Sequence, residues 1–270
     1  MLSRFGDLPQ RLLSALVLAP IALGCLWLGG VAWALLVTLA GVAIAVEWVR
    51  VCRFFPLSLP GLLLPVLVAA ASLGAASGFG LPVLAAILAV GAALAAGTGG
   101  GAGARRWLAA GLCYLGLAAV ATVWLRLRGP AGLGNMLFVV LIVWASDSGA
   151  YLVGRVVGGA KLAPRISPSK TWAGAVGGLA FAVAAGILVA EGFAAGPSAG
   201  VVLASTTLGV ASQAGDLLES VFKRRFGVKQ SGTLIPGHGG VLDRLDGVLA
   251  AVPAAAILAL ALGPGVELWR

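Results

Sequence analysis

Four acidic residues in the C-terminal part of the chain fall into two pairs, each with the spacing i, i+3. Asp216 is followed by Glu219, and Asp243 is followed by Asp246. On a helix, this spacing places both side chains of a pair on one face. Carboxylate oxygens are the protein ligands that Mg²⁺ prefers. The two pairs therefore predict a site for a divalent cation.

Basic residues and a glycine-rich turn lie between the acidic pairs. The cations are Lys223, Arg224, Arg225 and Lys229. The turn Gly237–Gly240 contains His238, the only histidine of the chain. Cations attract phosphates, and glycines let backbone N–H groups approach a ligand. Beside carboxylates for Mg²⁺, such groups indicate phosphoryl or nucleotidyl transfer. The simpler alternatives are an ion-paired loop and a purely structural role for His238.

A second polar segment lies upstream, between two apolar runs. Asp147 is near the end of one run, and the stretch SPSKT at 167–171 precedes the next. We expect this stretch to open a helix, where hydroxyls cap free N–H groups and the helix dipole favours a phosphate. Its candidate residues are Ser167, Lys170 and Thr171. Asp147 is a functional candidate because acids in apolar spans are costly, or it pairs with a nearby arginine. The segment lacks the spacing of a P-loop.

Long apolar runs surround these polar segments. Hydrophobic residues make up 60% of the sequence, and mean hydropathy is +1.07. Because roughly 20 apolar residues cross a bilayer as a helix and the alternation of a membrane β-barrel is absent, we predict an all-α polytopic membrane protein with about nine transmembrane helices. The expected spans are Leu12–Leu28, Val31–Val46, Leu57–Ala76, Leu81–Ala96, Leu108–Leu125, Leu137–Leu152, Trp172–Ala190, Val201–Phe222 and Val248–Leu262.

We expect residues 1–270 to form a single membrane domain with two unlike halves. Residues 1–130 contain plain spans and are interpreted as scaffold helices, whereas residues 131–270 contain the acids and patterned loops of a catalytic half. Cys25, Cys52 and Cys113 are scattered without the spacing of a metal site. We therefore interpret them as small buried apolar residues.

The positive charges predict the orientation in the membrane. With a cytoplasmic N-terminus, every Lys and Arg except Arg126, Arg128 and Arg270 falls in a cytoplasmic segment. The positive-inside rule then places the C-terminus on the opposite side and both polar segments in the cytoplasm. This topology and an attraction to anionic headgroups account for the net charge of +9. Nucleic acid is not expected as a partner, because no basic run is interleaved with aromatic residues.

The residues of the C-terminal polar segment, from Ser220 to Asp246, also form a longer pattern. It reads Ser220-Val-Phe-Lys-Arg, Lys229, Gly232, Pro236-Gly-His-Gly-Gly and Asp243-Arg-Leu-Asp. The pattern resembles the signature of the phosphatidate cytidylyltransferases, also called CDP-diacylglycerol synthases, and similarity at the level of motifs extends over about residues 147–247. The resemblance implies an enzyme that joins CTP and phosphatidic acid into CDP-diacylglycerol and pyrophosphate, with Mg²⁺ required and K⁺ as a possible second ion.

The same resemblance implies an all-helical fold with a polar cavity open to the cytoplasm and the membrane, a homodimer, and a place in the cell (inner) membrane. Carried over by position, the metal-binding carboxylates are Asp216, Asp243 and Asp246. The implied phosphate-binding and catalytic residues are Lys223, Arg224, Lys229, His238 and Arg244, with Ser167, Lys170, Thr171 and Ser220 completing the cavity. Gln230 stands where the family has Asp, and we interpret it as orienting Lys229 or the loop.

Two other functions remain open at this point. A CTP-dependent polyprenol or phytol kinase would also be multi-span and acid-dependent, but it would transfer the γ-phosphate. A secondary transporter also uses intramembrane acids and interrupted helices. Against a transporter, no inverted repeat is visible, and the acids gather with basic loops on one side of the membrane.

Overall fold

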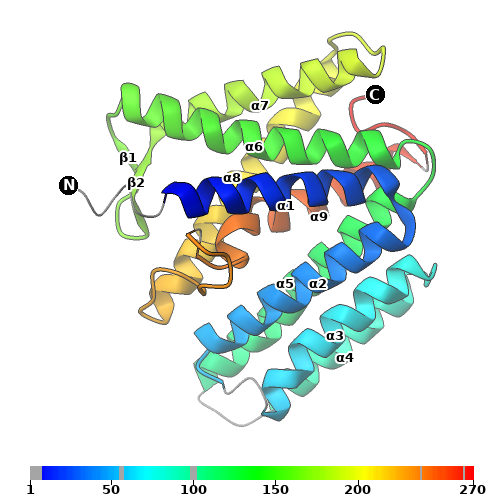
Figure 1. Cartoon of the computed structure of the whole chain (residues 1–270), viewed down its shortest axis with the longest axis vertical. Helices are drawn as coiled ribbons and strands as arrows, with labels where there is room; N and C mark the ends of the chain where they lie inside the picture. The colour runs from blue at the N-terminus through cyan, green and yellow to red at the C-terminus, as the bar shows by residue number, and fades with distance from the viewer. Residues whose placement is uncertain (1–7, 55–57, 98–101, 238, 264) are drawn as a thin grey trace. The chain divides into compact units, whose positions relative to one another are not determined.

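The computed structural model describes the backbone of residues 8–54, 58–97, 102–237, 239–263 and 265–270 (Figure 1). The expectation of a mainly helical protein is confirmed, since these residues form nine helices and one two-stranded hairpin. The helices are α1 (Leu8–Leu28), α2 (Gly30–Val51), α3 (Leu59–Ala76), α4 (Leu81–Gly97), α5 (Ala102–Leu127), α6 (Gly132–Val156), α7 (Trp172–Gly192), α8 (Ala199–Arg225) and α9 (Leu242–Leu262).

Among the described residues, six helices are long and apolar enough to cross a membrane. They are α2, α5 from Gly103 onward, α6, α7, α8 and α9, with lengths from 21 to 27 residues. A lipid-exposed segment must satisfy its own backbone hydrogen bonds, which a helix does. The apolar parts of α1, α3 and α4 are shorter, at residues 16–28, 61–76 and 84–97. The chain is thus a multi-pass membrane protein with six candidate spans among its described residues, and the count of nine stays a prediction.

The chain divides into two compact units, each built from two stretches of sequence. The first unit contains residues 1–123 and 225–245, and the second contains residues 124–224 and 246–270. In the first unit, α2 packs along α3, and the Thr38 and Ser72 hydroxyls share a hydrogen bond of 2.8 Å between these helices. Trp48 of α2 is buried and donates its indole N–H to the Trp107 carbonyl oxygen at 2.9 Å. Helix α2 is therefore firmly anchored.

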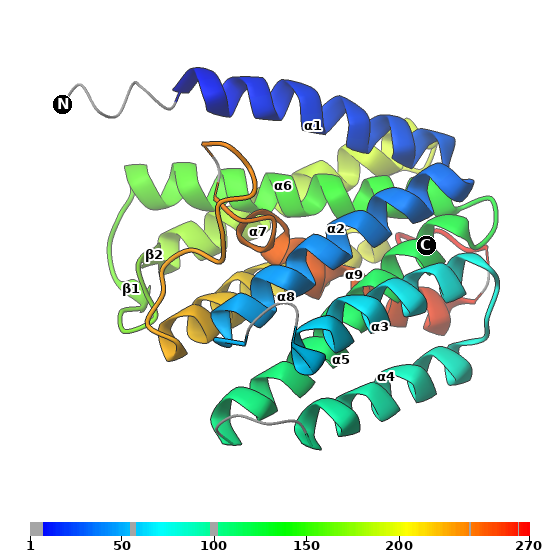
Figure 2. The ribbon, with the colours of Figure 1, turned by 60° about the horizontal axis from the view of Figure 1, so that its bottom comes forward.

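In the second unit, α6 and α7 run side by side (Figures 1 and 2). Small residues allow this close packing, as is common between helices in membranes. A Cβ atom at Gly174 would lie 2.8 Å from the Ala150 carbonyl oxygen, and one at Gly178 would lie 2.8 Å from the Ser146 carbonyl oxygen. These two glycines are four residues apart and so face α6 together.

The hairpin between α6 and α7 corrects one expectation. Strand β1 (Lys161–Ala163) pairs with β2 (Ser167–Thr171), so the stretch predicted to open a helix is instead extended. Helix α7 begins at Trp172, and Thr171 is its N-cap, with φ −122° and ψ 156°. The Thr171 hydroxyl accepts the Gly174 N–H at 3.0 Å. The predicted cap is therefore confirmed for Thr171, whose extended backbone, typical of an N-cap, also ends the strand.

Candidate active site

Three carboxylates gather where α8 meets α9 in the second unit. Oxygens of Asp216, Glu219 and Asp246 all lie within 4.8 Å of one another. Glu219 is 3% exposed, and the other two are half-buried. Three carboxylates this close repel one another strongly when they are shielded from water. An all-oxygen donor set of this kind fits a hard divalent cation.

Glycines at the α8–α9 crossing bring these acids together. A Cβ atom at Gly215 would lie 2.6 Å from the Asp246 carbonyl oxygen, and one at Gly247 would lie 2.5 Å from the Ser212 hydroxyl oxygen. Each glycine is a chain neighbour of a cluster acid, because Asp216 follows Gly215 and Asp246 precedes Gly247. The acidic cluster therefore depends on the close approach of the two helices.

Two lysines neutralise part of this negative charge. Lys223 lies one helical turn beyond Glu219, and its Nζ is 2.6 Å from the Glu219 carboxylate. Lys170 reaches from β2 to form an ion pair with Asp216. Both lysine side chains are largely shielded from water, which strengthens these pairs compared with surface ion pairs. The site thus combines carboxylates with cations, which is the composition that binds a metal together with phosphates.

A polar cavity of about 520 Å³ opens beside Asp216. Its volume lies within the range of roughly 300–1,000 Å³ common for small-molecule sites. The side chains that can donate to or accept from a ligand are Asp147, Tyr151, Arg155, Lys161, Ser169, Lys170, Thr171, Gln213 and Asp216. Asp147, expected as a functional acid or as a partner of an arginine, lines this cavity. Arg155 donates to the Tyr151 hydroxyl at 3.1 Å.

Gln213 connects the walls of this cavity. Its side-chain amide donates to the Ala175 carbonyl oxygen of α7 at 3.0 Å and to the Ser146 hydroxyl of α6 at 3.4 Å. The same helix face carries Asp216 three residues later. Gln213 therefore fixes α8 against α6 and α7 directly beside the acidic cluster.

The remaining predicted residues of the second unit lie around this centre. Ser220 is half-buried on α8, and Ser167 pairs with Ala163 in the hairpin. The Arg224 guanidinium donates to the Ile166 carbonyl oxygen at 3.3 Å, which ties the end of α8 to the hairpin. Of these three, none is among the residues that line the polar cavity.

In the first unit, Asp243 closes the loop that precedes α9. Its carboxylate accepts the backbone N–H groups of Ser231 at 3.0 Å and Gly240 at 3.1 Å. Lys229, Gln230 and Arg244 are exposed. His238 lies outside the described residues. The role of Asp243 as a metal ligand stays a prediction.

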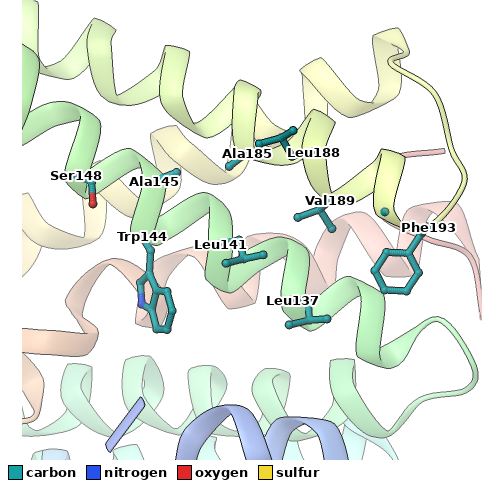
Figure 3. A pocket seen from close by; sticks show the side chains of 10 residues that line it. Leu137, Leu141, Trp144, Ala145, Ser148, Ala185, Leu188, Val189 and Phe193 are labelled. Atoms are coloured by element: carbon teal, nitrogen blue, oxygen red, sulfur yellow. The ribbon is translucent and has the colours of Figure 1, made fainter. Parts of the chain in front are cut away.

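An apolar groove of about 490 Å³ runs along α6 and α7 (Figure 3). From α6 it is lined by Leu137, Leu141, Trp144, Ala145 and Ser148, and from α7 and its C-cap by Ala185, Leu188, Val189, Gly192 and Phe193. On α6, Tyr151 and Arg155 of the polar cavity follow Ser148 of the groove at steps of three and four residues, so these side chains lie on the same helix face. One face of α6 therefore changes from apolar to cationic along its length.

Sequence reasoning left several of these positions out of the site. Tyr151, Arg155 and Lys161 were visible as polar residues near Asp147, but the hairpin that folds Lys161 back was not foreseen. Glu219 was recognised as the partner of Asp216, yet it was not counted among the metal ligands. Its spacing was the signal, since i, i+3 places both acids on one helix face.

Together, the fold and the site define a helical, multi-pass membrane protein with an acidic centre suited to a divalent metal and phosphorylated substrates. Comparison with known proteins narrows this class. The model of the cytidylyltransferase family matches residues 9–262. The chain therefore belongs to the cytidylyltransferase family and is a nucleotidyltransferase.

Two relatives match over most of their length. A phosphatidate cytidylyltransferase of Brucella suis is 41% identical over 254 residues, which cover 91% of each chain. A phosphatidate cytidylyltransferase of Pseudomonas aeruginosa is 38% identical over 275 residues, which cover 96% of this chain and 99% of that protein. The resemblance drawn from the signature residues is thereby confirmed.

Proposed function

We propose that this protein transfers the cytidylyl group of CTP to phosphatidate and releases CDP-diacylglycerol and pyrophosphate. The observation that carries the proposal is the Asp216, Glu219 and Asp246 cluster with its lysine partners, in a chain of the cytidylyltransferase family. The names of the two relatives supply the lipid substrate. A membrane location suits a reaction between a lipid and a water-soluble nucleotide.

The acidic cluster supports a divalent metal, which we propose to be Mg²⁺. Asp216 and Asp246 are the predicted ligands that lie in the cluster, and Glu219 is the third carboxylate there. Asp243 stays in the predicted set, one helical turn before Asp246 on α9. When bound, Mg²⁺ offsets the negative charge of the CTP phosphates. A K⁺ ion is proposed as a second cation of the same centre.

The reaction needs positioning and neutralisation of charge more than covalent catalysis. A phosphate oxygen of phosphatidate attacks the α-phosphorus of CTP, and the bond between that phosphorus and the oxygen bridging to the β-phosphate breaks, so pyrophosphate leaves. Lys170 and Lys223 already lie beside cluster acids and can contact phosphate oxygens as point charges. Because the attacking oxygen belongs to the lipid, no nucleophile from the protein is required.

One face of α6 lines both the apolar groove and the polar cavity, and this face supports a proposal for how the lipid binds. The phosphate of phosphatidate is proposed to lie at the cationic end, near Arg155 and Lys161, with an acyl chain along the apolar groove. Charge complementarity supports this placement, because the apolar lining is continuous with residues that attract an anion. The polar cavity then receives the headgroup.

The setting of the site is also part of the proposal. We place the N-terminus and the polar segments in the cytoplasm, the protein in the inner cell membrane, and the enzyme in a homodimer. Residues 131–270 form the proposed catalytic half of a single membrane domain, because the acidic cluster and the polar cavity both come from that half. Positive charge on the predicted cytoplasmic segments supports this orientation.

Labelled CTP distinguishes the proposed activity from its alternatives. Purified protein with phosphatidate and Mg²⁺ should form a CDP-lipid and pyrophosphate. Formation of CDP and a phosphorylated lipid alcohol would instead identify a kinase, which transfers the γ-phosphate. Flux of a solute into liposomes without CTP, together with no CDP-lipid in the first assay, would indicate a transporter.

A further inference from the structure

Glu47 is a buried acid in the half of the chain interpreted as scaffold. It lies near the end of α2, and the residue is 2% exposed. Its carboxylate accepts the N–H groups of Val241 at 3.0 Å and Leu242 at 2.9 Å, and it is bonded to the Ser231 hydroxyl at 3.1 Å. Burying an acidic side chain in such an apolar helix costs free energy, so Glu47 is a candidate for a functional role.

The glycines of the loop are spaced to admit this carboxylate. A Cβ atom at Gly232 would lie 2.7 Å from Glu47 Oε1, and one at Gly240 would lie 2.6 Å from Glu47 Oε2. Real Cβ atoms do not come this close to an oxygen. Two glycines of the signature pattern are therefore explained by the space that the Glu47 carboxylate occupies.

Glu47 also caps α9 from a different helix. Leu242 is the first residue of α9, and its N–H is one of the donors at a helix start that lack a partner within the helix. A carboxylate at this end is favoured by the helix dipole and forms charge-assisted hydrogen bonds. The contact fixes where α9 begins, and Asp243 is its second residue.

The loop is held by two carboxylates, those of Glu47 and Asp243. Ser231 donates one hydrogen bond from its hydroxyl to the Glu47 carboxylate and another from its backbone N–H to the Asp243 carboxylate. Gly240 donates to Asp243, and its neighbour Val241 donates to Glu47. Both ends of the loop are thus fixed, and between them Ile235 and Gly239 exchange backbone hydrogen bonds. Such contacts hold the backbone of Ser231, Gly240, Val241 and Leu242 in a set arrangement.

We infer that Glu47 is a positioning residue that holds the 231–242 loop in the conformation that binds a substrate phosphate. The inference rests on the proposed function, because the phosphate belongs to either CTP or phosphatidate. Glu47 itself acts through the loop. Through this contact the N-terminal half then contributes indirectly to substrate binding and is more than scaffold.

The kinetic test compares E47Q with a milder variant and a matched control. E47Q keeps the shape of the side chain but replaces one accepting oxygen with an NH₂ group that faces N–H or O–H donors. S231A removes only the hydroxyl contact. T38V removes a different buried hydrogen bond of the same helix, between α2 and α3. All three are measured for kcat and for the KM of each substrate.

We expect E47Q to raise the KM of one substrate by roughly tenfold, as for loss of a hydrogen bond to a charged group, with kcat changed less than about threefold. S231A should raise the same KM by about threefold, and T38V should leave both KM values within about twofold. The substrate whose KM rises identifies the phosphate that the loop binds. Unchanged KM values in both E47Q and S231A, or an equal rise in T38V, would overturn the inference.

Hydrogen exchange of the loop amides tests the geometry without any activity. The Val241 and Leu242 amides should exchange faster in E47Q than in the wild type or T38V, whereas amides of α6 and α7 should not change. If the wild type makes no CDP-lipid but this local pattern appears, the proposed function fails and the positioning geometry stands. Equal exchange in E47Q and the wild type would contradict the role of Glu47 itself.

Discussion

Gly215 on α8 lies directly against the main chain of Asp246 on α9, so that a Cβ atom at position 215 would come within 2.6 Å of the Asp246 carbonyl oxygen. Since Asp216 follows Gly215, this close approach sets the distance between two cluster acids. The absence of a side chain at one position therefore determines the geometry of the charged side chains beside it.

Gly215→Ala should impair catalysis by separating the two helices. Overpacking of this kind costs about 1–3 kcal/mol of stability, and a displacement of about 1 Å at a catalytic centre can cost on the order of 100-fold in rate. We expect kcat/KM for CDP-lipid formation to fall at least about tenfold. Gly24→Ala is the control, because nothing lies within 4 Å of a Cβ atom there. Equal activity in the two variants would show that the crossing does not set the site.

Lys170→Ala should lower kcat/KM for CDP-lipid formation. Expressed as free energy, this loss should exceed the loss of folding stability caused by breaking the ion pair with Asp216. The lysine lies both in the polar cavity and beside the acidic cluster, so its loss removes a positive charge from substrate phosphates. Hydrogen bonds to charged groups contribute about 1.5–3 kcal/mol, so kcat/KM should fall roughly 10- to 100-fold. Arg165→Ala is the matched control, because Arg165 is exposed on the same hairpin and does not line the cavity. A similar loss in both variants would indicate a general electrostatic effect.

Leu141→Trp should affect the lipid substrate selectively. The larger side chain would fill part of the groove along α6 and α7, which is proposed to hold an acyl chain. We expect the KM of phosphatidate to rise several-fold while the KM of CTP stays within about twofold. Leu203→Trp places the same side chain on an exposed position of α8 that is not part of the groove. If both variants give the same phosphatidate KM, the acyl chain lies elsewhere.

The Cys52 thiol should react slowly in the native protein. Burial raises the pKa of Cys52 from its ordinary value of 9.0 to about 12. At pH 8 this lowers the thiolate fraction by about a thousandfold, because each pKa unit is a factor of ten and the thiolate is the reactive form. Because burial disfavours the thiolate in the folded protein, this group leaves the folding stability unchanged below about pH 9 and lowers it as the pH rises from 9 toward 12.

Alkylation of Cys52 followed by mass spectrometry measures this reactivity. Native protein in detergent at pH 8 should remain largely unmodified at this position, and denaturant should restore ordinary labelling. Rapid labelling of Cys52 in the folded protein would contradict the burial of its thiol.

Much of the site could be predicted from local patterns in the sequence. Apolar runs predict the helices, because a membrane span must be long and apolar. The i, i+3 spacing placed Asp216 with Glu219 on one helix face, and the structure brings Asp246, predicted with Asp216 as a metal ligand, close to both. The hairpin at 161–171 was missed because Ser, Thr and Pro at 167–171 also suit the start of a helix. Pairing with the strand at 161–163 makes this stretch extended, and local sequence does not show that pairing.

Contacts distant in sequence could not be predicted. Glu47 meets Val241 and Leu242 across about 190 residues, and one acid at the end of an apolar run does not identify its partner. The cost of a buried acid was the one available signal, and it marks the position without naming the role. Gly215 and Gly247 likewise have meaning only once α8 and α9 are seen to cross.

The central claim is that the acidic cluster holds the metal for nucleotidyl transfer, and Asp246→Asn tests it most directly. The variant keeps the size of the side chain but loses the charge, so the protein should remain folded by circular dichroism. We predict that Mg²⁺-dependent formation of CDP-diacylglycerol from labelled CTP and phosphatidate is abolished in this variant and present in the wild type. Near-normal turnover of folded Asp246→Asn protein would contradict the assignment of the metal site.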